Sequence, residues 1–486
     1  MSASSSFRAF FRTSRFRRGV AACAVVLAAG GLVLVRAPKA AGGGVTVSQA
    51  GPAITTPSGP TSAKFTGPGA HGHLALSHGK LLGGAPRTFY AELVLAADAA
   101  EEAKQRAPLS LAVVLDTSGS MSGDKIEQAK NSVIQLLRDM DADDEIAVIR
   151  YDSDSSVVQP LARVGAVRAE LIEKVRAISS GGGTNIPPAL QKGLAQLDEA
   201  GRGRVRRVVL VSDGLDSTRS QAEDLAKSGA ARGVTISSMG IGLDFDESYM
   251  GGVARAGRGN FAFVKDASAL AGFLRRELKE GATTTIESAT ARIELPEGVR
   301  AVRAVGADLR TTNDGEAELS LGSLFAGDER RVIVELTGNL PAGELRSLNA
   351  SVTWSRVGGG SAEAKIDHLD IAGASTTAEV EEARDGAVFA SAVSALASVR
   401  QLEATDAYNR GEGARAQALI EENEMQIAAA ASAAPAATAE ALRRQLDGYR
   451  ETKTSFAAAP PTSTAGKAAA KAAAEKDLAN MGRNAF

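Results

Sequence analysis

Cysteine and aromatic residues are scarce in this chain of 486 residues. It contains one cysteine, Cys23, and aromatic residues make up 4% of it. A single cysteine cannot form an intramolecular disulfide, so stability must come from apolar cores. Few aromatic rings leave little surface for stacking on sugars or bases. Basic and acidic residues nearly balance, with a formal net charge of −2. Without a basic excess, no nucleic-acid partner is expected.

Long apolar runs are also rare, and the clearest one covers residues 19–35. Residues 1–18 before it carry five arginines and no acidic residue. This pattern predicts a signal sequence or membrane anchor over 1–36, with the rest of the chain exported. The 17 apolar residues would form a helix of about 25 Å, against a hydrocarbon core of about 30 Å. Cleavage and spanning both stay open. We expect a cell-envelope protein that is membrane-anchored, periplasmic or extracellular.

The pattern of residues changes several times along the chain and predicts separate units. They are a flexible linker at 37–80, the first strand or strands of a β-sandwich at 81–107, an α/β domain at 108–280, the main β-sandwich at 281–375, a helical region at 376–455, and an Ala-rich tail at 456–486 that we expect to be disordered or weakly helical.

Strand and helix patterns alternate within 108–280. Strand-like segments such as 110–115 and 206–211 are separated by segments with apolar residues three and four positions apart, as at Ile126, Ala129 and Val133. This spacing places Lys125 on the outer face of its helix. The alternation predicts an α/β fold with a doubly wound, mainly parallel sheet. Short segments rich in β-branched residues after 282 predict the β-sandwich.

One turn gathers hard oxygen atoms where the first of these strands ends. The apolar run Leu111–Leu115 stops at Asp116, and Ser118 and Ser120 follow within one turn. Open α/β sheets bind ligands at the carboxyl ends of their strands. Carboxylate and hydroxyl oxygens in that position indicate a site for a cation of the magnesium type.

Two further loops add oxygen atoms to the same edge. The glycine-rich stretch 179–185 offers Thr184 just ahead of a helix start at Pro187. The buried-type strand 207–212 ends in Asp213. Capping helices and ending strands is the alternative role for the two aspartates. Phosphoryl transfer by a D-x-D-x-T motif is a further alternative, but Ser118 replaces the second aspartate and the proton shuttle is missing.

These residues resemble the metal-ion-dependent adhesion site (MIDAS) of von Willebrand factor type A (vWA) domains, in which D-x-S-x-S is followed by T and then D. Asp116, Ser118, Ser120, Thr184 and Asp213 fill the five positions. The resemblance implies a Rossmann-like fold, direct binding of the metal by the serines and threonine, and aspartates that act mostly through water. The chain is also similar to bacterial relatives of inter-α-trypsin inhibitor heavy chains and calcium-activated chloride channel proteins. In these a β-sandwich is built from segments on both sides of the vWA domain.

The leading functional hypothesis is metal-dependent adhesion without enzymatic activity. Mg²⁺ takes about six oxygen ligands near 2.1 Å, so the five side chains leave room for an Asp or Glu from a protein partner. Mn²⁺ and Ca²⁺ are alternative cations. A metal-dependent hydrolase or phosphatase is one alternative function. The other is an envelope assembly scaffold in which the metal is only structural.

Overall fold

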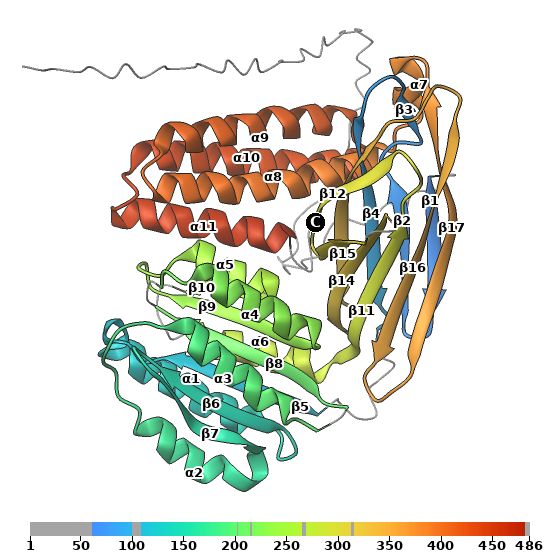
Figure 1. Ribbon diagram of the computed structural model, residues 1–486. Coiled ribbons are helices and arrows are strands. Elements are labelled where there is room, and N and C mark those ends of the chain that lie inside the picture. Colours follow the sequence, from blue (N-terminus) through green and yellow to red (C-terminus); the bar gives the residue numbers. More distant parts are fainter. Residues whose placement is uncertain are drawn as a thin grey trace, which may run out of the picture. The chain divides into compact units, whose positions relative to one another are not determined.

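The computed structural model describes residues 61–99, 108–201, 203–213, 216–264, 269–312 and 315–481 (Figure 1). These residues build an α/β domain, a β-sandwich and a set of C-terminal helices. The predicted signal sequence or anchor at 1–36 lies outside them, as does the linker up to residue 60. None of the described helices combines the length and the hydropathy needed to cross a membrane.

The α/β domain contains a sheet of six strands in the order β10-β9-β8-β5-β6-β7. All neighbouring pairs are parallel except β6 and β7. The strands are β5 (Leu109–Asp116), β6 (Glu145–Tyr151), β7 (Ser155–Arg163), β8 (Val205–Ser212), β9 (Val234–Ile241) and β10 (Arg258–Val264). The predicted mainly parallel sheet is therefore confirmed.

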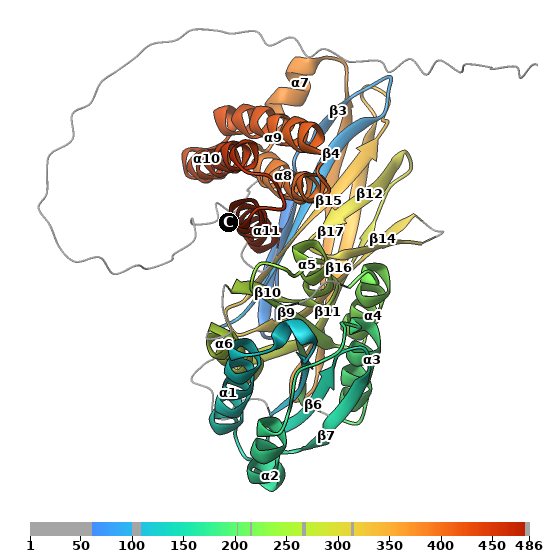
Figure 2. The same ribbon diagram turned by 90° about the vertical axis from the view of Figure 1, so that its left-hand side faces the viewer.

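Helices cover both faces of this sheet because side chains of each central strand alternate between two cores. Leu111 and Val113 of β5 point into one core, and Ala112 and Val114 into the other. The first core is completed by α1 (Asp124–Asp139), α2 (Val164–Arg176) and α6 (Leu270–Ala282). The second is completed by α3 (Ile186–Asp198), α4 (Arg219–Ala231) and α5 (Glu247–Ala256). Figure 2 shows α1 and α3 on opposite sides of the strands.

The edge strand β7 was not predicted from the sequence. It pairs antiparallel with β6, and its register shifts twice along the pair. Pro160 lies within it and cannot donate a ladder hydrogen bond, which is tolerated in an edge strand. A proline also makes a strand harder to predict from the sequence. Strand β7 therefore ends the sheet on this side.

Two sheets form the β-sandwich, and they share one apolar core. The first contains β1 (Ser62–Gly67), β2 (Ala70–Leu76), β4 (Arg87–Ala97), β15 (Glu329–Gly338) and β12 (Val299–Val305). The second contains β13 (Asp308–Thr311), β14 (Glu316–Phe325), β11 (Thr284–Glu294), β16 (Leu345–Arg356), β17 (Ser361–Ala374) and β3 (Lys80–Leu82).

Strand β4 precedes the α/β domain and β15 follows it, yet the two pair along ten residues. A strand within 81–107 therefore pairs with a strand after 282, as the two-sided sandwich of the similar proteins implied. The α/β domain is thus inserted into the sandwich, and both of its ends are fixed by strands.

The prediction of a mobile linker over 37–80 is wrong from residue 62 onward, because β1, β2 and the start of β3 lie there. Phe65 and Leu74 are buried in the sandwich core. A side chain at Gly72 would collide with the backbone of Val94 and the ring of Phe65. The small residues that suggested a linker are in fact needed for close packing of strands.

The C-terminal region contains α7 (Thr377–Glu382), α8 (Gly386–Asn409), α9 (Gly413–Ala433), α10 (Ala436–Ala458) and α11 (Thr464–Met481). The predicted disordered tail at 456–486 is corrected over 464–481, which form the packed helix α11. Lys471 in this helix is 3% exposed, and its ammonium pairs with Glu247 Oε2 at 2.8 Å. The small alanine side chains of α11 allow neighbouring elements to approach it closely, and the Lys471–Glu247 ion pair fixes α11 against α5. A polar, Ala-rich composition alone could not reveal that contact.

Candidate metal site

The candidate site lies where β5 and β8 end beside each other. The two strands are parallel neighbours with Leu115 opposite Val211. Asp116 is the last residue of β5, and Asp213 follows the last residue of β8. Both carboxylates are fully buried. The sheet therefore brings together two acidic residues that are almost a hundred positions apart in the sequence.

Hydrogen bonds connect four of the five predicted residues. The Ser118 amide donates to Asp116 Oδ1 at 2.8 Å. The Ser118 and Ser120 hydroxyl oxygens are 3.0 Å apart, and the Ser120 hydroxyl donates to Asp213 Oδ1 at 2.7 Å. The turn between Asp116 and Ser120 continues into a short 3-10 helix, Gly119–Met121. The D-x-S-x-S turn and the end of β8 thus form one polar cluster.

The loop that carries Thr184 is attached to the same turn through its backbone. The Gly181 amide donates to the Thr117 carbonyl at 2.7 Å, and the Gly119 amide donates to the Gly182 carbonyl at 3.0 Å. Gly182 has a φ of +79°, which a residue with a side chain rarely adopts. These bonds place the Thr184 loop beside the serines, although no hydrogen bond joins the Thr184 hydroxyl to the described part of the cluster.

Three further residues of the site were not identified from the sequence. Lys125 was expected on the outer face of its helix, but its ammonium forms an ion pair with Asp213 Oδ2. The Ser212 hydroxyl donates to Asp116 Oδ2 at 2.7 Å. Asp216 accepts the Ile186 amide at 2.7 Å, which fixes the start of α3 just after Thr184. Two sequence features could have assigned Lys125 and Ser212 to the site. Lys125 lies near the start of α1, close in sequence to the D-x-S-x-S turn, and Ser212 directly precedes Asp213.

Burial shapes the electrostatics of the two carboxylates. Desolvation raises the pKa of Asp116, and the negative charge of Asp213 raises it further, while hydrogen bonds from Ser118 and Ser212 lower it. Tyr151 lies buried close by and donates to the Val211 carbonyl at 3.1 Å. Burial and then the charge of Asp116 raise the pKa of its phenol well above the usual range. A cation at this edge would relieve the repulsion between the two carboxylates.

The donor set suits a hard divalent cation. It offers hydroxyl and carboxylate oxygens, which are the ligands that Mg²⁺, Mn²⁺ and Ca²⁺ prefer. Within the described ranges, no three His, Cys, Asp or Glu side chains cluster as a metal site would require. A cation here would therefore depend on the serine and threonine hydroxyls as well as on Asp116 and Asp213.

Comparison with known proteins agrees with this architecture. The family model for the von Willebrand factor type A domain matches residues 110–276. This range covers the six-stranded sheet and reaches into α6. The α/β unit is therefore a vWA domain, as its D-x-S-x-S motif indicated.

The sequence relatives include bacterial and animal proteins. The protein sll0103 of Synechocystis is 27% identical over 277 residues, which cover 54% of this chain and 65% of that protein. YfbK of Escherichia coli is 27% identical over 242 residues, which cover 47% and 42% respectively. Human inter-alpha-trypsin inhibitor heavy chain H4 is 29% identical over 157 residues, which cover 29% and 16%. The matched region spans less than two thirds of each of these relatives.

Solved structures share the fold over most of this chain. A von Willebrand factor type A protein from Catenulispora acidiphila has a TM-score of 0.64 at 16% identity, covering 85% of this chain and 96% of that one. The ArnB paralog VWA2 from Sulfolobus acidocaldarius has a TM-score of 0.56 at 17% identity, covering 86% and 98%. The predicted fold class, a vWA domain with a flanking β-sandwich and C-terminal helices, is confirmed.

Proposed function

We propose that this protein binds a protein partner through a divalent cation held at Asp116, Ser118, Ser120, Thr184 and Asp213. Mg²⁺ is the cation we expect, with Mn²⁺ and Ca²⁺ as alternatives. The main support is the hydrogen-bonded series from Ser118 through Ser120 to Asp213, beside the buried Asp116 carboxylate. Membership of the vWA class, which serves protein interaction, supports the same function.

Each residue would contribute in a different way. The Ser118 and Ser120 hydroxyls would bind the cation directly, and Thr184 would approach from its glycine-rich loop. Asp116 already accepts the Ser118 amide and the Ser212 hydroxyl, so its carboxylate would position Ser118 and supply charge. Asp213 would divide its charge between the cation and Lys125. The bound cation would offer a Lewis-acidic position to a carboxylate oxygen of the partner.

The same arrangement favours binding over catalysis. A hydrolase that acts through a side-chain nucleophile would need an activated hydroxyl beside a general base. The two serine hydroxyls here bond to each other and to Asp213, and the sequence contains no histidine between His78 and His368. We therefore place the metal-dependent hydrolase or phosphatase behind the binding function.

We extend the proposal to the cell envelope. Residues 1–18 are rich in arginine and residues 19–35 are apolar, a combination that directs export and can hold a chain at the membrane. The vWA domain would then meet its partner outside the cytoplasm. Fractionation of cells that express the full chain tests this step, and recovery in the cytosolic fraction would contradict it.

Calorimetric titration with Mg²⁺ tests the metal site. We expect saturable uptake by the wild-type protein and a loss of affinity of about 10–100-fold in Asp116→Asn. Asp124→Asn is the matched control, because Asp124 is an exposed carboxylate at the start of α1. Circular dichroism should be the same for all three proteins. Normal uptake by Asp116→Asn would discard the assignment of the ligands.

Affinity purification from membranes, with and without EDTA, tests the link between cation and partner. We expect EDTA to release the partner, and substitution of one acidic residue of the partner by its amide to have the same effect. The alternative is an envelope scaffold in which the metal only stabilises loops. In that case EDTA would lower the melting temperature and leave the association intact.

A further inference from the structure

A cavity of about 560 Å³ lies on the vWA domain away from the metal-site residues. It is lined by parts of α4, α5, β10 and α6 of the vWA domain, by parts of β12, β13 and β15 of the sandwich, and by parts of α8 and α11. None of Asp116, Ser118, Ser120, Thr184 and Asp213 lines it. Its volume lies within the range of about 300–1,000 Å³ that is usual for small-molecule sites.

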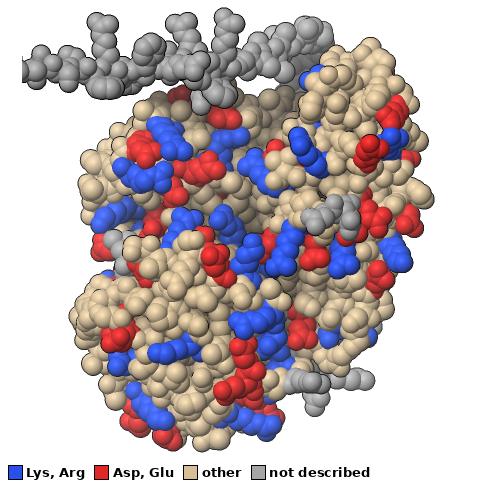
Figure 3. Space-filling view, in the orientation of Figure 1, with Lys and Arg blue, Asp and Glu red and all other residues tan. Residues whose placement is uncertain are grey.

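The walls of this cavity carry an excess of positive charge. Its lining includes six basic residues, Lys227, Arg255, Arg258, Arg276, Arg303 and Arg330, against three acidic residues, Glu223, Asp224 and Asp308. In the space-filling view, Lys and Arg side chains gather near the centre of this face (Figure 3). Because the whole chain has a net charge of −2, this local excess is a property of the cavity and not of the overall composition.

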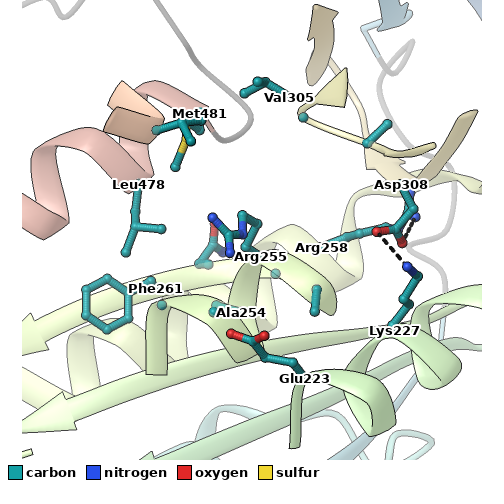
Figure 4. A pocket seen from close by; sticks show the side chains of 18 of the residues that line it. Glu223, Lys227, Ala254, Arg255, Arg258, Phe261, Val305, Asp308, Leu478 and Met481 are labelled. Atoms are coloured by element: carbon teal, nitrogen blue, oxygen red, sulfur yellow. Dashed lines mark hydrogen bonds and ion pairs between the residues drawn. The ribbon is translucent and has the colours of Figure 1, made fainter. Parts of the chain in front are cut away.

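Two of the three acidic residues of the wall form ion pairs. Asp308 pairs with Arg258 at 2.9 Å and with Lys227 at 3.6 Å (Figure 4). Glu223 pairs with Arg219, which is not part of this wall, at 2.7 Å. Asp308 therefore offsets two of the basic residues, and Arg303 pairs with Glu335 outside the wall at 2.7 Å. None of these ion pairs involves Arg255.

Arg255 projects from α5 into the cavity without a carboxylate of its own. Figure 4 shows its side chain in the space between α11 and the β12–β13 connection. Its guanidinium forms no hydrogen bond or ion pair with any residue in the part of the chain that the structure describes. A guanidinium presents a planar set of donors that matches the oxygens of a phosphate or carboxylate.

Arg258 provides a second donor deeper in the wall. It is 8% exposed, and its φ of +58° is unusual for a residue with a side chain. One terminal nitrogen donates to the Ser320 carbonyl and the other to Asp308, while its buried Nε has no hydrogen-bond partner among the described residues. A buried donor without a partner is costly, so an acceptor that reached it would be bound favourably.

Apolar side chains line another part of the cavity. They include Phe261 of β10, Val399 of α8, and Leu478 and Met481 of α11. Leu478 can approach α5 closely because residue 251 is glycine, and a Cβ there would collide with Leu478. A ligand in this cavity would therefore meet both arginine and apolar side chains.

We propose that the cavity between α5, β10 and α11 binds a small organic anion whose phosphate or carboxylate group contacts Arg255 and Arg258. Its apolar body packs against Phe261, Leu478 and Met481. Since the ligand touches the vWA domain and α11 together, it also stabilises the contact between them. This site is independent of the divalent cation.

Calorimetric titration in the presence of EDTA tests this site separately from the metal site. The probes are phenyl phosphate, benzoate, inorganic phosphate and phenol. We expect saturable binding of phenyl phosphate or benzoate, weaker binding of inorganic phosphate because it lacks the apolar body, and none of phenol. No binding of either aromatic anion up to about 10 mM would overturn the proposal, because a useful site binds at millimolar concentration or below. Equal binding of phenol would also overturn it, since charge would then be irrelevant.

Two arginine variants locate the binding. Arg255→Gln should weaken binding of the aromatic anion at least about tenfold, because a charge-assisted contact is lost. Arg275→Gln is the matched control, since Arg275 is exposed on α6 next to Arg276 but does not line the cavity. Because the Arg255 guanidinium has no partner among the described residues, its variant should keep the wild-type melting temperature. Unchanged affinity in Arg255→Gln would place the anion elsewhere and contradict the assignment. Loss of Mg²⁺ uptake in Asp116→Asn should leave anion binding intact.

Discussion

The carboxyl edge of the vWA sheet and the face of α5 that α11 covers are both charged, but they are assembled differently. At the edge, neighbouring loops of one domain bring Ser118, Ser120 and Asp213 into direct hydrogen bonds. At the other face, Lys471 reaches Glu247 across more than two hundred residues of sequence. The first arrangement follows from a short motif in a known fold. The second depends on the docking of a separate helix.

We infer that the polar residues at the sheet edge serve recognition of a partner, whereas the buried ion pair under α11 holds the fold together. Ser120 at the edge is exposed and can meet a partner, whereas Lys471 and Glu247 are both buried and hold two parts of the chain together. We therefore expect substitutions at the edge to change binding and substitutions under α11 to change stability. The following predictions test this division, beginning with the largest expected effect.

Breaking the buried ion pair of Lys471 should cost the most stability. Its ammonium pairs with Glu247, donates to the Phe245 carbonyl at 2.8 Å and lies 4.2 Å from the centre of the Phe245 ring. Lys471→Met should destabilise the protein by about 3–5 kcal/mol, because Glu247 would be left buried without a counterion. Thermal melting and proteolysis of α11 measure the loss.

Lys467 is the matched control for this prediction. It lies one turn earlier on α11 and pairs with Asp244 at 2.7 Å, but both side chains are substantially exposed. Lys467→Met should cost only about 0–1 kcal/mol, because water screens the pair. If the two variants had the same melting temperature, burial of the Lys471 ion pair would not explain how α11 is held against α5.

The stability of the packed C-terminal helices should also depend on pH, through Asp477. This carboxyl group is buried between α11 and α10, where the Tyr449 hydroxyl donates to it at 3.0 Å. Burial raises its pKa from 3.8 to about 7. Because the folded state holds this proton more tightly, its contribution to stability is fully present below pH 3.8 and is lost as the pH rises through about 7.

We expect the wild-type protein to gain about 2–3 kcal/mol relative to Asp477→Asn when the pH falls from about 8 to about 5. Asp447→Asn is the control, since Asp447 on α10 is exposed and pairs only with Arg450 among the described residues. Denaturant unfolding at several pH values measures the difference. A constant difference between wild type and Asp477→Asn across this range would show that Asp477 ionises normally.

A smaller effect is expected at the metal edge from Lys125. Its ammonium is bound to Asp213, so it competes with a cation for that carboxylate and repels it. Lys125→Met should tighten Mg²⁺ binding about threefold, whereas Arg138→Met at the exposed far end of α1 should not change it. Weaker binding in Lys125→Met would mean that the ammonium helps to arrange the site.

Sequence patterns predicted the elements of the vWA domain except the edge strand β7. The helix predicted from the spacing of Ile126, Ala129 and Val133 is α1, and these three residues are buried as that spacing required. The turn that joins Asp116 to Ser118 and Ser120 also lies where the motif placed it. These features depend on neighbours in sequence, so a local pattern describes them well.

Features that depend on distant contacts were not predicted. Strands β1 and β2 are rich in small and polar residues. They pair with each other, and β2 also pairs with β4, so the shared sheet stabilises them. Helix α11 has little apolar asymmetry and is fixed by Lys471 and Asp477. The pairing of Lys125 with Asp213 depends on where β8 ends. The metal-binding role of the five predicted residues stays a prediction.

The most direct test of the central claim is a crystal structure with Mn²⁺, located by its anomalous scattering. The account predicts one strong peak within about 2.5 Å of the Ser118 and Ser120 hydroxyl oxygens, with Asp116, Thr184 and Asp213 around it and a position left open to solvent or to a partner carboxylate. A peak at another location, or no peak in crystals that contain millimolar Mn²⁺, would contradict the account.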